Sequence, residues 1–197
     1  MTAEGAAPSD LEKLRVGIVL GTTRPGRRGE QVAKWVHGIA NQRTDATFEL
    51  VDLADYALPL LDEPVPPSAH KYSRPHTTRW AEKIGSLDAF VIVTPEYNHS
   101  TSASLKNAID FLYAEWNNKV VGFVSYGSAG GIRAVEHLRQ IFAEVEVATV
   151  KAQAWFSLAN DFENWTTFKP SSGKDQAVTK MLDQLVKWGR ALRSVRA

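Results

Sequence analysis

The chain has 197 residues, of which 44% are hydrophobic and 23% charged, a composition typical of globular proteins that excludes wholesale disorder. Its formal net charge of +1 at pH 7 gives no overall attraction to nucleic acid or to an anionic membrane. Because the sequence has no cysteine, disulfides, Cys-ligated metal centres and thiol catalysis are excluded.

The first residues differ in composition from the rest. Met1–Lys13 lacks the basic start and apolar core of a signal peptide, and its Ala and Pro content predicts a loose tail over residues 1–13. No apolar run approaches the ~18 residues that a membrane-spanning helix needs. We therefore expect residues 14–197 to form a single domain of a cytoplasmic protein that has no nucleic-acid or membrane partner.

The spacing of apolar residues predicts strands and helices in alternation. The run Leu14–Leu20, rich in β-branched residues, predicts a buried strand, and apolar positions three and four apart predict a helix over 29–41. In chain order, the same two patterns then predict a strand over 47–53, a helix over 76–86, a strand over 89–94, a helix over 102–113, a strand over 119–125, a helix over 132–142, a weaker strand over 149–156 and a helix over 175–195. Prolines at 59, 64, 66, 67 and 75 exclude regular structure between residues 57 and 75.

This alternation indicates βαβ units, and therefore an α/β fold with a mainly parallel sheet covered by helices on both faces. In open parallel sheets, ligands bind beyond the carboxyl ends of the strands, where the strand order reverses. The loops after the first, third and fourth predicted strands are therefore the candidate site.

The first of these loops is "GTTRPGRRGEQ", residues 21–31. It leads into a helix, whose first backbone N–H groups are unpaired and attract an anion. Thr22, Thr23 and Gln31 add side-chain donors, and the planar guanidinium of Arg24 suits phosphate oxygens. The pattern predicts a phosphate site, the alternative being a solvated basic loop with a threonine cap.

Two common nucleotide motifs do not fit this loop. Gly21 and Gly26 have the spacing of a P-loop, but Arg27 and Arg28 replace its Lys and its metal-binding Ser or Thr, which argues against nucleotide hydrolysis. The GxGxxG dinucleotide motif is also absent. Asp52, near the end of the second strand, is interpreted as a structural or loop-capping carboxylate rather than a ribose ligand.

The loop after the third strand begins "TPEYNHS". Pro95 fixes φ, and we expect it to leave the N–H groups of Glu96, Tyr97 and Asn98 available at the sheet edge. The hydroxyl residues 100–104 predict a cap on the next helix. A planar, hydrogen-bonding ring would fit there, with Tyr97 beside it and Asn98 either pinning the turn or meeting the ligand.

The loop after the fourth strand, "SYGSAGG", places Gly127, Gly130 and Gly131 between a strand and a helix. Glycines accept positive φ and allow the backbone to approach a flat ligand closely. The alternative is tight packing of the loop on the sheet.

These three loops resemble those of the NADPH-dependent FMN reductase family, which includes quinone, chromate and azo-dye reductases. The matching pieces are "GTTRPGR", "TPEYN" followed by "LKNAIDFL", and "SYGSAGG", in matching order over about residues 14–158. The resemblance implies a flavodoxin-like three-layer sandwich with a five-stranded parallel sheet in the order 2-1-3-4-5. It implies FMN as cofactor and NADPH or NADH as electron donor.

The resemblance also assigns residues by position. Those implied around the FMN phosphate are Thr22, Thr23, Arg24, Gly29, Glu30 and Gln31, and those implied around the flavin ring are Pro95, Glu96, Tyr97, Asn98, Ser125, Tyr126, Gly127 and Ser128. Two departures bear on the phosphate: Thr22 replaces a common serine, and Arg27, Arg28 and Gly29 occupy the stretch where many relatives have a second serine.

The implied function is an oxidoreductase that takes hydride from NAD(P)H and passes electrons to quinones, free flavin or similar small acceptors. Because such chemistry belongs to the cofactor, no catalytic side chain is predicted. The histidines lack the spacing of a metal site, although His99 is expected near the flavin rim. A flavodoxin-type electron carrier and a flavin-binding sensor without efficient turnover remain alternatives. The near-neutral charge and the arginines of the first loop favour the reductase over the carrier.

The proline-rich segment is longer than a simple connection, and long loops in compact domains tend to have functions. In relatives the corresponding segment borders the flavin or a neighbouring subunit. We predict a homodimer or homotetramer in which this segment contacts a partner. The apolar residues of "LKNAIDFLYAEW", ending in Trp116, are further candidates for that contact, with core burial as the alternative explanation.

Overall fold

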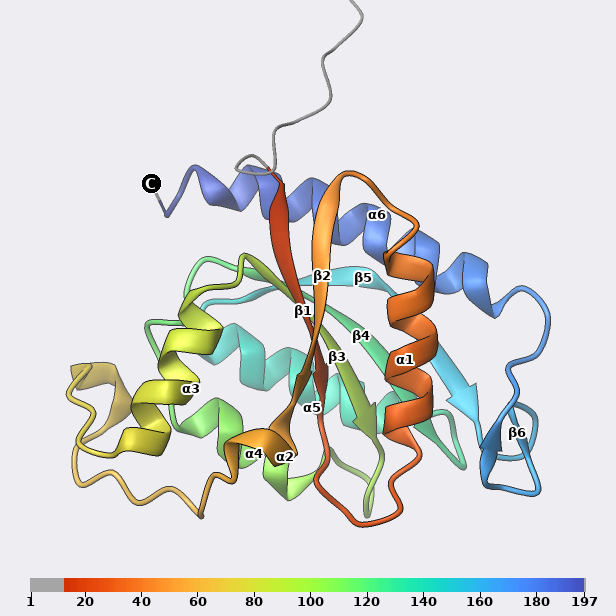
Figure 1. Ribbon diagram of the computed structural model, residues 1–197, viewed down its shortest axis with the longest axis horizontal. Coiled ribbons are helices and arrows are strands. Elements are labelled where there is room, and N and C mark those ends of the chain that lie inside the picture. The colour runs from red at the N-terminus through yellow and green to blue at the C-terminus, as the bar shows by residue number, and fades with distance from the viewer. Residues whose placement is uncertain (1–12, 197) are drawn as a thin grey trace, which may run out of the picture.

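A five-stranded parallel sheet forms the centre of the computed structural model, which describes residues 13–196. Its strands are β1 (Leu14–Leu20), β2 (Ala46–Asp52), β3 (Ala89–Pro95), β4 (Val120–Gly127) and β5 (Ala148–Ser157). They lie in the order β2-β1-β3-β4-β5, which confirms the predicted flavodoxin-like arrangement (Figure 1). The predicted tail, residues 1–13, lies outside the described residues except for Lys13.

Helices cover both faces of the sheet, as alternating side chains on buried strands require. On one face lie α1 (Gly29–Ala40) and α6 (Lys174–Arg193), and on the other α2 (Leu53–Tyr56), α3 (Pro75–Gly85), α4 (Ala103–Asp110) and α5 (Ile132–Glu144) (Figure 1). Strand β4 shows the alternation, since Val120 and Val124 pack towards α1 and α6 while Val121 and Phe123 pack towards the other helices.

The predicted elements agree with the observed ones to within about three residues at each end. The largest difference is α4, which ends at Asp110 rather than at residue 113. The short helix α2 was not predicted: β2 ends at Asp52, whose carboxylate accepts a hydrogen bond from the Ala54 N–H (2.9 Å) and so caps α2. The predicted loop-capping role of Asp52 is therefore confirmed.

A small antiparallel hairpin, β6 (Phe162–Glu163) and β7 (Thr167–Phe168), was also not predicted. Phe168 packs edge-on against Phe156 of β5 and Trp35 of α1, with ring centroids 4.9 and 5.6 Å apart. This aromatic packing places the hairpin beside the N-terminal half of α1, next to the first loop (Figure 1).

The proline-rich segment contains only a short 3-10 helix at Pro67–Ala69. It is anchored to α4, because the Asn107 side chain accepts from the Leu61 N–H (2.9 Å) and donates to the Pro59 carbonyl (2.7 Å). The carboxylate of Glu63 accepts from the backbone of residues 73 and 74 and closes the loop on itself. The absence of regular structure was therefore correctly predicted for most of this segment.

The apolar residues of the stretch "LKNAIDFLYAEW", residues 105–116, point into the core. Leu105, Ile109 and Trp116 are each 1% exposed, and Trp116 packs against the rings of Trp80 and Phe90. Core burial, the alternative explanation, therefore accounts for these three residues, and they are not available for contact with a partner subunit.

Candidate cofactor site

The loops after β1, β3 and β4 meet at the carboxyl edge of the sheet. The hydroxyl oxygens of Thr22 and Tyr97 lie 3.1 Å apart, within hydrogen-bond distance, and join the first loop to the second. A Cβ placed on Gly127 would lie 3.3 Å from that of Glu96, so the third loop packs directly on the second. Between them is a cavity of about 250 Å³ lined by Arg24, Gly26, Arg27, Arg28, Pro95, Glu96, Tyr97, Tyr126, Gly127 and Leu158.

The first loop offers backbone donors that have no partner. In the described part of the chain, no hydrogen-bond acceptor faces the N–H groups of Thr23, Gly26, Arg28 and Glu30. These donors lie at the N-terminus of α1, where the helix dipole also favours negative charge. The loop therefore has the features of an anion site.

The three arginines of this loop have different surroundings. The Arg27 guanidinium forms a two-point ion pair with Asp52 and donates to the Thr22 carbonyl (2.9 Å), so its charge is neutralised and it fixes the shape of the loop. Arg24 has no carboxylate partner among residues 13–196, and its guanidinium lies 6.0 Å from the Tyr97 ring centroid. The Arg28 Nε is buried and unpaired. Arg24 and Arg28 are thus the cations left for a ligand.

The second loop is more self-contained than the sequence suggested. The Glu96 N–H donates to the Tyr126 carbonyl (3.0 Å), and the Tyr97 N–H donates to the Ser100 carbonyl (2.9 Å). The prediction that these two N–H groups are available is therefore wrong. The Glu96 N–H continues the pairing of β3 with β4, and the Tyr97 N–H is engaged in a tight turn that Asn98 and His99 close with positive φ. The Asn98 N–H keeps no acceptor within the described residues.

The Glu96 side chain is bound by α5 and is only 6% exposed. Its carboxylate accepts from the backbone N–H of Arg133 (3.2 Å) and from the Nε of the same residue (2.7 Å), which satisfies it at the start of the helix. Arg133 was not predicted as a site residue; the only signal was its opposite charge in the first turn of the helix that follows the third loop. The pair holds the second and third loops together.

The third loop is shaped by glycines and by one hydroxyl. The buried Ser125 Oγ donates to the Gly130 carbonyl (2.7 Å), and Gly130 and Gly131 both have φ near +73°. A Cβ on Gly131 would lie 2.8 Å from the Ser125 Cβ, so the loop turns back onto the strand in a way that only glycine allows. Ser128, which precedes this turn, is exposed.

Tyr126 points the other way, because neighbouring residues of a strand face opposite sides of a sheet. Its ring lies towards α1 and packs near Phe162 of the β6–β7 hairpin, with centroids 6.2 Å apart. Burial raises the pKa of the Tyr126 phenol well above its usual value. The residue is 5% exposed, and its hydroxyl lies at the N-terminus of α1 beside Gly29.

The side chains of Glu30 and Gln31 are engaged away from the cavity. Glu30 pairs with Lys34 on the surface of α1 (2.7 Å). The Gln31 amide donates to the Thr166 carbonyl (3.0 Å) and accepts from the Phe168 N–H (2.8 Å), which ties the β6–β7 hairpin to α1. Glu30 therefore offers its unpaired backbone N–H to a ligand, whereas the Gln31 N–H donates to the Arg28 carbonyl (3.1 Å).

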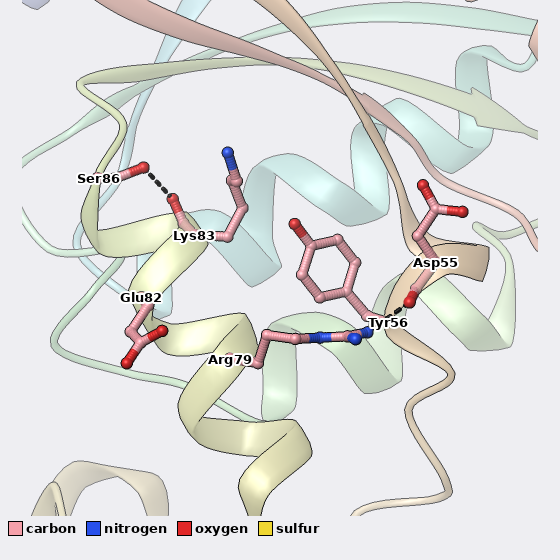
Figure 2. A pocket seen from close by; sticks show the side chains of 6 residues that line it. All are labelled: Asp55, Tyr56, Arg79, Glu82, Lys83 and Ser86. Atoms are coloured by element: carbon pink, nitrogen blue, oxygen red, sulfur yellow. Dashed lines mark hydrogen bonds between the residues drawn. The ribbon is translucent and has the colours of Figure 1, made fainter.

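A wider cleft of about 510 Å³ lies elsewhere, between α2 and α3 (Figure 2). Its two cations already have partners: Arg79 donates to the Asp55 carbonyl and lies 5.0 Å from the Tyr56 ring centroid, and Lys83 pairs with Glu49. Within residues 13–196 there is no cluster of His, Asp and Glu that could hold a metal ion, and no helix long and apolar enough to cross a membrane.

Comparison with known proteins identifies the family of the chain. The sequence matches the family described as NADPH-dependent FMN reductase over residues 14–161. It is 32% identical to the NAD(P)H-dependent FMN reductase of Nectria sp over 87% of this chain and 94% of that protein, and 38% identical to the quinone reductase of Escherichia coli K12 over 66% and 70%. The solved structure of the flavoenzyme NAD(P)H:(acceptor) oxidoreductase from Paracoccus denitrificans covers 90% of this chain and 98% of its own, with a TM-score of 0.69 at 19% identity.

The fold, the cavity at the carboxyl edge and these matches agree with one another. The family match covers most of the chain, and the Nectria protein is matched over nearly its whole length, which together assign the chain to a family. The chain belongs to the NADPH-dependent FMN reductase family and is an FMN-dependent oxidoreductase that uses NAD(P)H.

Proposed function

We propose that this protein binds FMN in the cavity between the three loops and reduces quinones or free flavins with electrons from NAD(P)H. The observation that carries the proposal is the convergence of Thr22, Tyr97 and Gly127 at one edge of the sheet, around unpaired N–H donors. The names of the relatives from Nectria and Escherichia coli support the donor and the quinone acceptor.

The residues present suit a flat, singly phosphorylated cofactor. The first loop supplies donors and two uncommitted cations, while the nearby carboxylates Asp52, Glu30 and Glu96 are each neutralised by a basic side chain. An anion bound there therefore meets no unpaired negative charge from these three groups. The glycine turn of the third loop brings backbone, rather than side chains, to the other end of the cavity.

We assign roles along the cavity accordingly. The phosphate would be held by the side chains of Thr22, Thr23 and Arg24 and by the backbone of Gly29 and Glu30, while Gln31 supports the start of α1 from the hairpin. The ring would lie against Pro95, Glu96, Tyr97 and Asn98 on one side and against Gly127 and Ser128 on the other, with Ser125 and Tyr126 supporting the third loop.

FMN, when bound, supplies the electron transfer from NAD(P)H to the acceptor. The protein binds and orients the ring, and Tyr97, which is hydrogen-bonded to Thr22 and lies near Arg24, joins the wall of the cavity beside the ring to the phosphate loop. Glu96 holds the second loop against α5 through Arg133, so it acts as a positioning residue rather than a proton donor.

A second copy of the chain is proposed to cover part of the site, as a homodimer or within a homotetramer. The proline-rich segment offers the apolar side chains for this contact, since Leu60 is 82% and Leu61 42% exposed. Replacing both leucines by Ser should shift the molar mass measured by light scattering towards that of a single chain. A cytoplasmic location also remains a prediction, which fractionation of cells would test.

The proposal is tested by flavin binding followed by turnover. Purified protein should carry FMN or take it up, and should then oxidise NADPH or NADH steadily when a quinone is supplied. Arg24→Ala should weaken FMN binding about tenfold or more, because it removes a charge-assisted hydrogen bond. Arg79→Ala, in the cleft of Figure 2, is the matched control and should leave FMN affinity unchanged.

Two results would contradict the proposal. Protein that takes up no FMN would refute the site, and protein that binds FMN but shows no steady NAD(P)H oxidation with any quinone or flavin would be a carrier or a sensor instead.

A further inference from the structure

Two buried polar atoms without partners lie at the N-terminus of α1. In the described part of the chain, the Tyr126 hydroxyl and the Arg28 Nε are buried and have no hydrogen-bond partner. A polar group in that position costs stability unless something binds it. Arg28 is the N-cap of α1, and the Tyr126 hydroxyl lies beside Gly29, the first residue of the helix, next to the unpaired backbone donors of the first loop.

Gly29 makes room for the Tyr126 ring. A Cβ on Gly29 would lie 2.7 Å from the Tyr126 hydroxyl oxygen and 3.4 Å from the ring carbon that carries it. The ring is held from the other side by Phe162 of the β6–β7 hairpin. Packing on both sides of the ring therefore fixes the hydroxyl at the start of the helix.

The surroundings of the hydroxyl favour its use as a donor. A tyrosine phenol is protonated at neutral pH, and burial raises the pKa of this one further. The groups of the first loop that act on its titration, the Gly29 backbone N–H, Arg27 and Arg28, are all donors. The backbone N–H groups at the start of α1 are also donors, so the hydroxyl has no acceptor nearby to which it can donate a hydrogen bond. An oxyanion would supply that acceptor, and the helix dipole favours negative charge at the N-terminus.

We propose that the Tyr126 hydroxyl donates a hydrogen bond to the FMN phosphate, so that Tyr126 acts at the phosphate end of the cavity rather than at the flavin ring. The inference rests on the proposed function, and it deepens it by assigning a donor from β4, outside the phosphate loop. The Tyr126 ring already lines the same cavity as Arg24 and Gly26. Because the oxygen is out of contact with solvent, a small opening of the loop is required, and Gly26, with φ of +69° and open space around it, allows one.

The test compares FMN with riboflavin, which has the same ring and no phosphate. Affinities of the apoprotein for both flavins are measured for wild type and for Tyr126→Phe. We expect the variant to bind FMN about tenfold to a hundredfold more weakly, the range for a hydrogen bond to a charged acceptor, and to bind riboflavin as wild type does. Tyr72→Phe is the matched control: its hydroxyl bonds to Glu115 (2.7 Å) on another part of the surface, so both affinities should stay unchanged.

The unfolding of the apoprotein gives a second readout. Tyr126→Phe removes only an unpaired buried oxygen, so the melting temperature of the apoprotein should stay the same or rise, whereas the FMN-bound form should lose part of its extra stability. Gly29→Ala displaces the hydroxyl without removing it, and should likewise weaken FMN binding more than riboflavin binding.

Other outcomes overturn the inference in distinguishable ways. If Tyr126→Phe weakens both flavins equally, or neither, the hydroxyl does not serve the phosphate, while the proposed function stands. If wild-type apoprotein binds neither flavin, the proposed function fails and this inference falls with it.

Discussion

Replacing Gly131 by Ala tests how the third loop is held against the sheet. Gly131 has φ of +73°, in the left-handed region, and a Cβ there would lie 2.8 Å from the Ser125 Cβ and 2.9 Å from the Tyr126 backbone nitrogen. Because one of the clashing atoms belongs to the backbone of β4, rotation of a side chain cannot relieve the overlap. The loop would have to move away from the strand.

Gly173 provides a control that separates the two costs. It has φ of +82°, and a Cβ there would meet nothing within 4 Å. Gly173→Ala should therefore cost only the strain of a left-handed alanine, about 1–2 kcal/mol. Gly131→Ala should cost that strain plus an overpacking penalty of about 1–3 kcal/mol, for a total of about 2–5 kcal/mol.

The measurement is urea unfolding of both apoprotein variants, with FMN affinity measured in parallel. Gly131→Ala should lose more stability than Gly173→Ala and should also bind FMN more weakly, because the third loop is displaced from the cavity. If the two variants lose the same stability, a Cβ at position 131 does not overlap β4 as the structure indicates.

Three further predictions concern other parts of the chain. Burial lowers the pKa of Lys119 to about 8 from an ordinary 10.5, so between these pH values the unfolded chain binds more protons than the folded one. The free energy of unfolding should therefore rise with pH in this range, by up to about 1.4 kcal/mol per pH unit, in wild type but not in Lys119→Met. Parallel pH profiles of the two proteins would contradict this. Gln31→Ala should speed hydrogen exchange at the Phe168 N–H and cost about 1–2 kcal/mol while leaving FMN affinity intact; a large loss of affinity would mean that the amide side chain itself binds FMN. Arg133→Ala should weaken FMN binding because it leaves the Glu96 carboxylate without its guanidinium partner beside an anionic cofactor. Arg133→Lys should restore part of the affinity, as flavin titrations of wild type and the two variants would show.

Much of the fold followed from local patterns. Strand β1 has the bounds that its run of β-branched residues predicts, and Ser102 caps α4 as the hydroxyl cluster indicated, accepting from the Leu105 N–H (3.1 Å). The capping role of Asp52 was also predictable, because an acid at the end of a strand readily caps the turn that follows. In each case the interaction lies within a few residues along the chain.

What was not predicted depends on residues far apart in sequence. Gln31 is engaged by a hairpin more than 130 residues later, and strands of two residues have no periodicity that could announce β6 and β7. The Glu96 N–H was expected to be free, but it continues the pairing of β3 with a strand about 30 residues later. The Tyr97 N–H is engaged in a turn whose positive φ values at Asn98 and His99 carry no clear sequence signal. Strand alternation predicts that Tyr126 faces opposite to Ser125, but not which face meets α1.

Backbone amide NMR shifts, followed while the apoprotein is titrated separately with FMN and with riboflavin, would show which loop holds the phosphate and which loops hold the ring. FMN should shift the amides of residues 22–30, 96–98 and 127–129, and riboflavin should shift the last two groups but not the first. Identical patterns for the two flavins, or shifts confined to the cleft between α2 and α3, would contradict this placement of the cofactor.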